Sequence, residues 1–417
     1  MRILIHGLNF TPEPVGTGKY TGEMARWLVS RGHQVKVICA PPYYPEWRVA
    51  AGYPAWGYRR ETLEGVEVLR CPLWVPRKVG AATRLLHLSS FTLSSIIPML
   101  WQRHWRPDVV LAIEPPLAGV LPAWLAGMLT GARTWLHVQD FEIDAAFGLG
   151  LLRSEALRRG ACRLEAALMR RLDRISTISE TMVERAMRKT GGRPPCVLFP
   201  NWVDTGQIRP LPGASPYRKE LGIGDGQIVL LYSGSMGAKQ GLEVVLDAAR
   251  GLAGDPRVLF VMAGAGPAHE RLRAAAADIG NMRWLPLQPA RRLNAFLNLA
   301  DVHLLPQRAD AADLVMPSKL TGMLASGRPV IATARAGTQI AQVVRGAGLV
   351  VEPGDPGALI QAIMRLADDA ALRQSLGAAA RGYATEMLER ERVLAGFERE
   401  LTGVLRGELD GIPDTPS

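Results

Sequence analysis

The stretch DLVMPSKLTGMLASGRPVIAT, residues 313–333, decides how the rest of the chain is interpreted. The letters MPS at 316–318 suit a helix start, because proline is tolerated in the first turn and serine can cap free backbone N–H groups. Leucine and methionine then recur at helical spacing until Gly327, and residues 329–332 have the composition of a strand. The stretch therefore predicts a loop, a helix and a strand that follow one another closely.

The start of this helix is a candidate anion site. Free N–H groups at a helix N-terminus carry partial positive charge and attract phosphate, and Lys319 adds a formal charge. We therefore predict that Pro317, Ser318 and Lys319 face an anionic ligand. The alternative is an ordinary strand–helix–strand crossover whose helix is well capped.

Length and composition favour two globular domains. A chain of 417 residues exceeds what one core usually supports, and 48% hydrophobic with 21% charged residues is typical of a soluble protein. The four cysteines lack CxxC spacing, which argues against a zinc site or a disulfide framework and suits a reducing cytoplasm. The chain opens directly with a strand pattern, so we expect no secretory signal.

The net charge of +10 belongs to the first half of the chain. Residues 1–200 hold 26 Lys and Arg against 16 Asp and Glu, whereas the remainder holds 23 of each. A basic half suits nucleic acid, an anionic membrane surface or phosphorylated substrates. Two uncharged apolar segments, 85–101 and 117–132, are short for a membrane span, so we expect buried or interfacial helices there. The segment 73–106 is a candidate for shallow membrane contact.

Short apolar runs alternate with helical stretches in both halves, which is the pattern of a parallel sheet covered by helices on both faces. We predict two doubly wound α/β domains, residues 1–200 and 201–383, that face a cleft, and a helical segment with a loose tail over 384–417. The expected strands are 3–5, 35–39, 66–69, 109–113, 135–138 and 175–178, then 228–232, 258–262, 282–285, 302–305, 330–333 and 349–351. Ligands of such sheets bind beyond the carboxyl ends of the strands.

The loop after the first strand, residues 6–22, is rich in glycine. It fails the dinucleotide fingerprint, which needs Gly at Thr21, and the P-loop pattern, which needs Ser or Thr at Tyr20. Gly16 and Gly18 can nevertheless let backbone N–H groups approach a phosphate or a sugar hydroxyl. The alternative is a flexible turn.

Carboxylates follow the strand 135–138 in the run QDFEID, residues 139–144. A calcium loop would need glycine after Asp144, where the chain has alanine. Asp140 or His137 is a candidate proton acceptor or sugar-hydroxyl anchor. For His137 the alternative is a core histidine whose ring nitrogens are satisfied.

Glycine, serine and basic residues follow several strands of the second half. The run YSGSMGAKQG, residues 232–241, contains Ser235 and Lys239; Gly264 follows the next strand, and Arg308 lies after a later one. Because the carboxyl ends of parallel strands meet at one edge of a sheet, these residues imply a phosphorylated nucleotide.

Taken together, these motifs resemble the retaining GT-B glycosyltransferases of family 4, and within it the colanic-acid-type exopolysaccharide enzymes. The resemblance rests on NFTPEP (9–14), GTG (16–18), HVQDFEIDAA (137–146), STISE (176–180), FPNWVD (199–204), YSG (232–234), KQG (239–241), PSK (317–319) and ASGRP (325–329). It implies two Rossmann-like domains, with the acceptor in the first and the nucleotide sugar mainly in the second. It also implies a C-terminal helix that crosses back to the first domain.

The resemblance further implies roles for individual residues. The donor diphosphate would be bound by Gly16, Thr17, Gly18, Ser235, Lys239, Pro317, Ser318 and Lys319. The sugar or nucleotide would be bound by Gly264, Leu287, Arg308, Asp313 and Met316. Asp140 and His137 are the catalytic candidates. The sequence contains no Asp-X-Asp tripeptide, so we expect neither a metal nor another cofactor.

Two departures from the family pattern affect the donor site. The family has Arg after the first Gly of the 232–241 loop and Lys before the last one, whereas this chain has Ser235 and Gln240. The family's paired glutamates fall at Leu314 and Gly322, with Asp313 as a candidate substitute for the first. Phosphate neutralisation and ribose recognition are therefore expected to differ.

The expected function is metal-independent, retaining transfer of a sugar from a GDP- or UDP-linked donor to a hydroxyl of a lipid-pyrophosphate-linked oligosaccharide in bacterial exopolysaccharide biosynthesis. The basic loop ends would stabilise charge on the departing diphosphate. The basic first half would contact an anionic membrane, which makes the protein cytoplasmic and peripheral on the inner face of the cytoplasmic membrane. The alternatives are a GT-B-fold nucleotide-sugar epimerase and a basic nucleic-acid-binding protein; the second does not explain the anion loops, so we expect no nucleic-acid partner.

Overall fold

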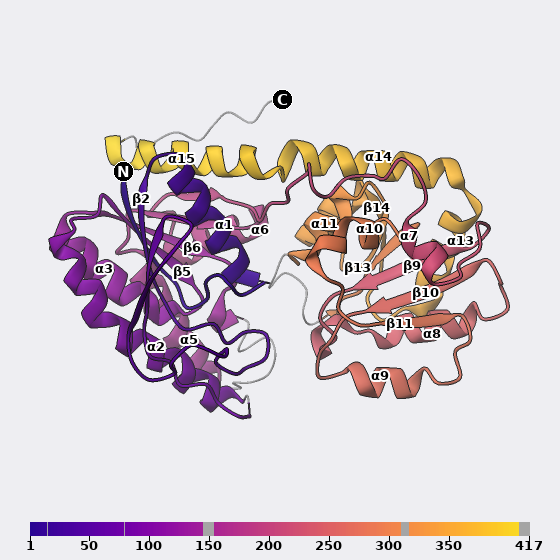
Figure 1. The fold of residues 1–417 in the computed structure, drawn as a ribbon, viewed down its shortest axis with the longest axis horizontal. Helices are drawn as coiled ribbons and strands as arrows, with labels where there is room; N and C mark the ends of the chain where they lie inside the picture. The colour runs from indigo at the N-terminus through magenta and orange to yellow at the C-terminus, as the bar shows by residue number, and fades with distance from the viewer. Residues whose placement is uncertain (15, 79, 145–153, 310–316, 408–417) are drawn as a thin grey trace. The chain divides into compact units, whose positions relative to one another are not determined.

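A computed structural model describes residues 1–14, 16–78, 80–144, 154–309 and 317–407 (Figure 1). The chain forms two compact units. The first contains residues 1–200 and the segment that begins at Leu394, and the second contains residues 201–393. The chain thus enters the second unit after Pro200 and rejoins the first within its last long helix, later than the expected start of the terminal segment at residue 384.

The first unit is built on a sheet with the strand order β3-β4-β2-β1-β5-β6-β7-β8. Its strands are β1 Arg2–His6, β2 Gln34–Cys39, β3 Arg59–Leu63, β4 Val66–Arg70, β5 Val109–Glu114, β6 Arg133–Val138, β7 Arg174–Thr177 and β8 Cys196–Leu198. Neighbouring strands pair in parallel except β3 with β4. All six residues of β5 are buried, which indicates that both faces of the central sheet are covered.

Helices pack on this sheet from several connections. They are α1 Gly16–Ser30, α2 Ala81–Trp101, η1 Gln102–His104, η2 Leu117–Gly119, α3 Val120–Thr130, α5 Glu155–Met169 and α6 Glu180–Thr190. Helices α1 and α2 contact β2, α3 contacts β5 and β6, and α6 contacts β7 and β8. The ends of α6 follow ordinary capping chemistry, because the Ser179 hydroxyl accepts the Met182 N–H and Gly191 ends the helix in the left-handed conformation.

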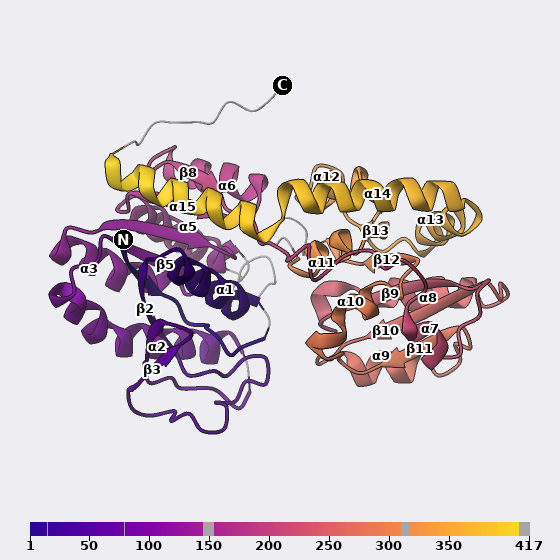
Figure 2. The ribbon, with the colours of Figure 1, turned by 45° about the horizontal axis from the view of Figure 1, so that its top comes forward.

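The last helix, α15 Arg390–Arg406, packs on the first unit (Figures 1 and 2). The Phe397 ring stacks on that of Phe199 with 4.2 Å between ring centres and meets Trp135 edge-on at 5.2 Å. The Glu398 carboxylate lies 2.8 Å from the His33 ring nitrogen. Aromatic stacking and a partly buried hydrogen bond between His33 and Glu398 therefore hold this segment, distant in sequence, against the first sheet.

The second unit is built on a parallel sheet with the order β11-β10-β9-β12-β13-β14. Its strands are β9 Ile228–Ser233, β10 Val258–Ala263, β11 Met282–Leu285, β12 Val302–Leu305, β13 Val330–Thr333 and β14 Gly348–Val351. This is the 3-2-1-4-5-6 order of doubly wound nucleotide-binding folds, in which the direction of winding reverses between the first and fourth strands. The loops after β9 and β12 therefore flank the position where such folds bind ligands.

Helices cover both faces of the second sheet (Figure 2). They are α7 Pro216–Glu220, η3 Ala238–Gln240, α8 Glu243–Gly251, α9 His269–Ala275, η4 Ala290–Arg292, α10 Leu293–Leu297, α11 Lys319–Ala325, α12 Gln339–Arg345, α13 Pro356–Asp368 and α14 Ala370–Met387. Leu230 and Tyr232 pack with α8, α9 and α13, whereas Val229 and Leu231 point to the other face and pack with α7 and α10. Because successive side chains of a strand point to opposite faces of the sheet, the apolar strand β9 contributes to a hydrophobic core on each face.

The helices in the described ranges include none with the length and hydropathy that a membrane crossing requires.

Candidate active site

The loop after β9, residues 234–241, is fastened to the loops on either side of it. The Gly234 N–H donates to the Ala263 carbonyl at 3.0 Å, at the end of β10. On the other side the Arg308 N–H, beyond β12, donates to the Lys239 carbonyl at 3.1 Å. The structure therefore brings the predicted donor loops of β9, β10 and β12 together by backbone hydrogen bonds.

Gly264 permits the close approach of two of these loops. A Cβ atom at this position would lie 1.9 Å from the Gly234 carbonyl oxygen, and the backbone φ is +144°. Both conditions exclude other residues. The structure thus gives Gly264 a backbone role in shaping the loop; its predicted contact with the nucleotide stays a prediction.

Lys319 is the first residue of α11, which follows β12. It lies at the switch point of the second sheet, the position between β9 and β12 where the direction of winding reverses. Its ammonium nitrogen is 4.1 Å from the centre of the Tyr232 ring, and its methylene chain lies against Gly234. The nitrogen is buried and has no hydrogen-bond partner among the described residues. Burial lowers the pKa of Lys319 to about 7. A buried ammonium without a partner is unfavourable, and an anion bound beside it would supply the missing partner.

The prediction that the Ser318 side chain caps this helix is wrong. The backbone of Ser318 is already helical, with φ −58° and ψ −24°, and its side chain makes no capping hydrogen bond. A capping serine needs an extended backbone to turn its hydroxyl toward the following N–H groups. Ser318 is exposed instead, which leaves its hydroxyl accessible from solvent.

The other predicted donor residues lie around this point with different exposure. Ser235 and Arg308 are exposed and Lys239 is half-buried. Arg308 also lines an open pocket of about 480 Å³ beside the N-terminal turn of α8. Leu287, in the loop after β11, is exposed. The predicted ligands Asp313 and Met316 lie outside the described residues.

The positions where the sequence departs from the family have local roles here. The Gln240 side-chain oxygen accepts the Gly237 N–H at 3.0 Å, so this amide closes its own turn where the family has a basic residue. A Cβ at Gly322 would lie 3.2 Å from a methyl carbon of Leu297. The second glutamate position is therefore used for close packing of α11 on α10. Leu314 lies outside the described residues.

In the first unit the predicted glycine loop leads into α1. Gly16 opens the helix with φ +63° and is partly exposed. Gly18 is buried, and a Cβ there would lie 2.7 Å from a carboxylate oxygen of Glu13. Gly18 is thus required for packing, whereas Gly16 and Thr17 remain accessible at the helix N-terminus.

Glu13 is a structural residue of this loop that sequence reasoning missed. One of its carboxylate oxygens accepts the N–H groups of Tyr43 at 3.0 Å and Tyr44 at 3.1 Å, and the other accepts the Asn9 amide at 2.9 Å. The side chain is buried, and burial raises its pKa. It ties the loop after β1 to the loop after β2. The available signal was a lone acid between two prolines in a glycine-rich loop.

The two catalytic candidates of the first unit differ in environment. His137, on β6, is buried; its ring nitrogens lie 2.9 Å from the Ser176 hydroxyl and 2.9 Å from the Gln139 amide. Burial lowers the pKa of His137 to about 3, so the ring is neutral. These features match the alternative interpretation of His137, a core histidine whose two ring nitrogens are hydrogen-bonded. Asp140 is half-buried just beyond the end of β6, at the ligand-binding edge of the sheet.

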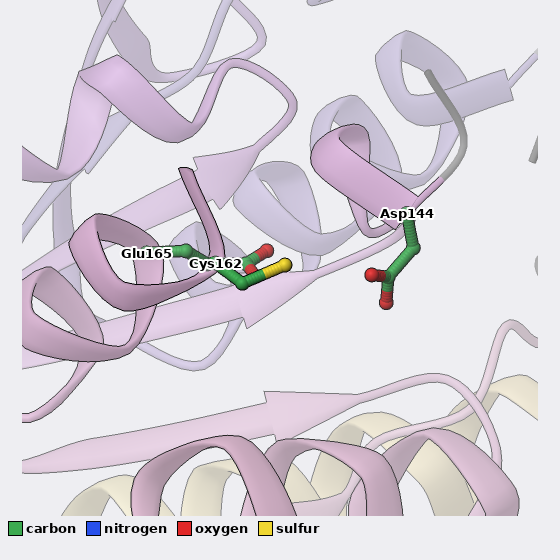
Figure 3. A group of neighbouring side chains, drawn as sticks. All are labelled: Asp144, Cys162 and Glu165. Carbon is green, nitrogen blue, oxygen red and sulfur yellow. The ribbon is translucent and has the colours of Figure 1, made fainter. Parts of the chain in front are cut away.

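Asp144, Cys162 and Glu165 bring three potential metal ligands within 4.8 Å of one another (Figure 3). Cys162 and Glu165 come from α5, and Asp144 follows β6. The Lys189 ammonium pairs with both Asp144, at 3.1 Å, and Glu165, and Arg185 pairs with Asp144 at 3.4 Å. The acids are thus already neutralised by cations, and the cluster is an ion-pair network.

Glycosyltransferases of the GT-B class consist of two doubly wound domains. This chain has two such units, and basic residues lie in the loops beyond the carboxyl ends of β9 and β12 in the second. The sequence matches two models of this class: the glycosyl transferase 4-like domain over residues 15–202 and the glycosyl transferases group 1 over residues 214–383. The chain belongs to this family and is a glycosyltransferase. Family membership favours glycosyl transfer over the epimerase and nucleic-acid-binding alternatives.

One relative is similar along its whole length. The chain is 40% identical over 414 residues to WcaI of Escherichia coli (strain K12), which covers 97% of this chain and 100% of that protein. The name of that protein assigns it provisionally to colanic acid biosynthesis as a glycosyl transferase.

Solved structures share the fold. A sucrose-phosphate synthase from Thermosynechococcus elongatus is 16% identical with a TM-score of 0.77, covering 97% of this chain and 99% of that one. HepE of Anabaena, solved in complex with UDP, is 15% identical with a TM-score of 0.71, covering 97% of this chain and 100% of that one.

Proposed function

We propose that this glycosyltransferase moves a sugar, with retention of anomeric configuration and without a metal, from a GDP- or UDP-linked donor to a hydroxyl of a lipid-pyrophosphate-linked oligosaccharide in bacterial exopolysaccharide biosynthesis. The observation that carries the donor part is the buried ammonium group of Lys319 at the switch point, which has no hydrogen-bond partner among the described residues. The WcaI relative and its assigned pathway support the acceptor part, and the UDP bound to HepE supports the nucleotide.

In this proposal Lys319 stabilises the leaving group. Departure of the nucleoside diphosphate places negative charge on the phosphate oxygens, and a cation held in a protein environment lowers the energy of that charge more than water does. Binding of the diphosphate raises the lysine pKa again, because an adjacent opposite charge favours the protonated form. Lys239 and Arg308, on the neighbouring loops, would add to the positive potential.

Metal independence is supported by the chemistry of the side chains in these loops. Divalent ions such as Mg²⁺ are bound through carboxylate oxygens. The β9 loop contains Ser235 and Lys239, and the described part of the β12 loop, residues 306–309, contains Arg308 and no carboxylate; Asp310 and Asp313 of the same loop lie outside the described residues. Lys239 and Arg308 supply the positive charge that a metal ion supplies in other transferases.

The first unit would hold the acceptor. Asp140, at the carboxyl end of β6, would accept a hydrogen bond from a sugar or acceptor hydroxyl, and His137 behind it would keep this edge in place as a neutral core residue. The excess positive charge of residues 1–200 suits an acceptor with a lipid pyrophosphate and a peripheral position on the inner face of the cytoplasmic membrane.

The donor proposal is tested by thermal unfolding with UDP-, GDP-, ADP- and dTDP-sugars, each with and without EDTA. Selective binding raises Tm by mass action, so one nucleotide class should stabilise the protein and EDTA should leave the shift unchanged. A shift that disappears with EDTA would contradict metal independence. No shift with any donor would contradict the assigned site.

Retention is tested separately by NMR of the product. The anomeric proton coupling of the transferred sugar should match that of the donor, and an inverted product would contradict the proposal.

A further inference from the structure

Helix α2 exposes a largely apolar face, on which the half-exposed Ser89 and Ser90 stand between Leu86 and Leu93. Leu86, Leu93, Ile97 and Trp101 are 60%, 68%, 68% and 66% exposed. They are separated by seven, four and four residues, so they lie on one side of the helix. The other side is buried in the first unit and contains Phe91 and Met99. The exposed face extends over about 22 Å at 1.5 Å per residue.

The composition of this face differs from that of an ordinary solvent-exposed helix face. The 21 residues of α2 include Arg84 as their one Lys, Arg, Asp or Glu. A surface helix of a globular domain normally presents charged and polar residues to water. A contiguous exposed apolar patch bordered by polar groups marks an interaction site.

An exposed tyrosine from a neighbouring loop, Tyr58, lies against α2, and Trp56 of the same loop is exposed as well. Trp56 is 74% exposed and Tyr58 is 53% exposed. The Tyr58 hydroxyl donates to the backbone carbonyl of Ser94, on α2, at 2.8 Å. Tryptophan and tyrosine favour the boundary between a bilayer and water, because one end of each ring is apolar and the other is polar. We call Leu86, Leu93, Ile97, Trp101 and Tyr58 the α2 face.

Basic residues stand at both ends of the helix. Arg77 and Lys78 precede α2 and are exposed, and Arg103 and Arg106 follow it and are exposed as well. An apolar stripe with cations at its ends matches the charge of an anionic phospholipid surface.

We propose that the α2 face binds an anionic phospholipid bilayer, with α2 lying parallel to the membrane plane. A second copy of this chain fits less well, because both ends of α2 are basic and either orientation of two paired helices brings like charges together. Among the described helices none can cross a bilayer, so the contact is peripheral. The inference rests on the proposed function in one respect, the membrane location of the acceptor.

The test uses sedimentation with vesicles of phosphatidylcholine alone and of phosphatidylcholine mixed with phosphatidylglycerol. The wild-type protein should bind the mixed vesicles and lose binding as salt rises. The Leu93→Gln/Ile97→Gln variant should bind at least about tenfold more weakly, since two inserted side chains lose their apolar transfer free energy. Leu164→Gln is the matched control, because this α5 leucine is also 60% exposed; it should bind as wild type.

A second variant tests the charges. Arg77→Gln/Lys78→Gln should weaken binding to mixed vesicles and flatten its salt dependence. Equal binding to both kinds of vesicle would overturn the anionic part of the inference. Wild-type binding by Leu93→Gln/Ile97→Gln would overturn the α2 face itself.

The experiment contains neither donor nor acceptor, so its failure is distinct from failure of the proposed function. Thermal shifts with the nucleotide sugars should be the same in all these variants, which also shows that they fold. A wild-type dimer in sedimentation velocity that dissociates in Leu93→Gln/Ile97→Gln, without vesicle binding, would overturn the proposal and assign the α2 face to self-association.

Discussion

The ammonium nitrogen of Lys319 lies 4.1 Å from the centre of the Tyr232 ring and makes no hydrogen bond to the described residues. The ring's negative face compensates part of the charge, and such a contact is worth about 0.5–2 kcal/mol. The rest of the desolvation cost remains unless an anion binds. The site is therefore arranged for a ligand at the expense of the ligand-free fold.

The first prediction follows from this cost. Lys319→Met should leave the ligand-free protein as stable as wild type at pH 6, or more stable, because the variant buries no charge. It should also abolish the Tm shift produced by the nucleotide sugar and lower turnover at saturating donor. Lys219→Met, at an exposed lysine of α7, is the control and should keep both. A donor shift that persists in Lys319→Met would contradict the assignment.

The second prediction concerns pH. The pKa of Lys319 is lowered to about 7 from its ordinary value of 10.5, so between these values the unfolded chain binds more protons than the native one. Stability from this group then rises with pH across the window from 7 to 10.5, and below pH 7 the full penalty is present. The free energy of unfolding of wild type minus that of Lys319→Met, measured by urea titration, should therefore increase over that range. A flat difference would indicate that the lysine is solvated.

The main strands of the fold could be predicted because each is a short run of apolar residues in the sequence. The run Val109 to Ile113 was expected as a strand from its apolar residues and forms most of β5. Strand β3, with the sequence RRETL, was missed. It is an edge strand in which half-exposed and exposed residues alternate. Its composition does not indicate a strand, and its extended conformation depends on pairing with β4.

The site could be predicted less completely, for a physical reason. The sequence predicted Lys319 at the start of a helix, and the structure places it there; its contact with a phosphate stays a prediction. Its burial depends on the Tyr232 ring, 87 positions earlier in the chain, and could not be read from local pattern. The role of Glu13 depends in the same way on backbone N–H groups of a different loop.

The third prediction concerns the Asp144–Glu165–Lys189 network. Glu165 is fully buried, and Lys189 is its ion-pair partner. Lys189→Met should lower the free energy of unfolding by about 3 kcal/mol, since it leaves a buried carboxylate uncompensated. Adding Glu165→Gln should restore part of the loss. Arg188→Met, which breaks the exposed pair with Glu184, should change stability by less than about 1 kcal/mol.

The same network gives that prediction a pH signature. Burial raises the pKa of Glu165, and the lysine partner opposes this. Without Lys189 the native carboxyl should remain protonated to higher pH than in the unfolded chain, so the penalty of the variant should shrink as pH falls toward 5. Equal penalties at pH 5 and pH 8 would show that lost packing, and not charge, causes the effect.

The last prediction compares two helical glycines. A Cβ at Gly18, in α1, would lie 2.7 Å from a Glu13 oxygen and 2.9 Å from the Glu13 Cβ, whereas a Cβ at Gly160, in α5, would meet nothing within 4 Å. Gly18→Ala should therefore displace Glu13 and lower stability by about 1–3 kcal/mol, with a fall in turnover because Gly16 and Thr17 move with the loop. Gly160→Ala should raise stability by up to about 1 kcal/mol, since alanine favours the helix, and should leave turnover unchanged. Urea unfolding and initial rates measure both effects, and a Gly18→Ala protein with unchanged stability would show that Glu13 does not fix this loop.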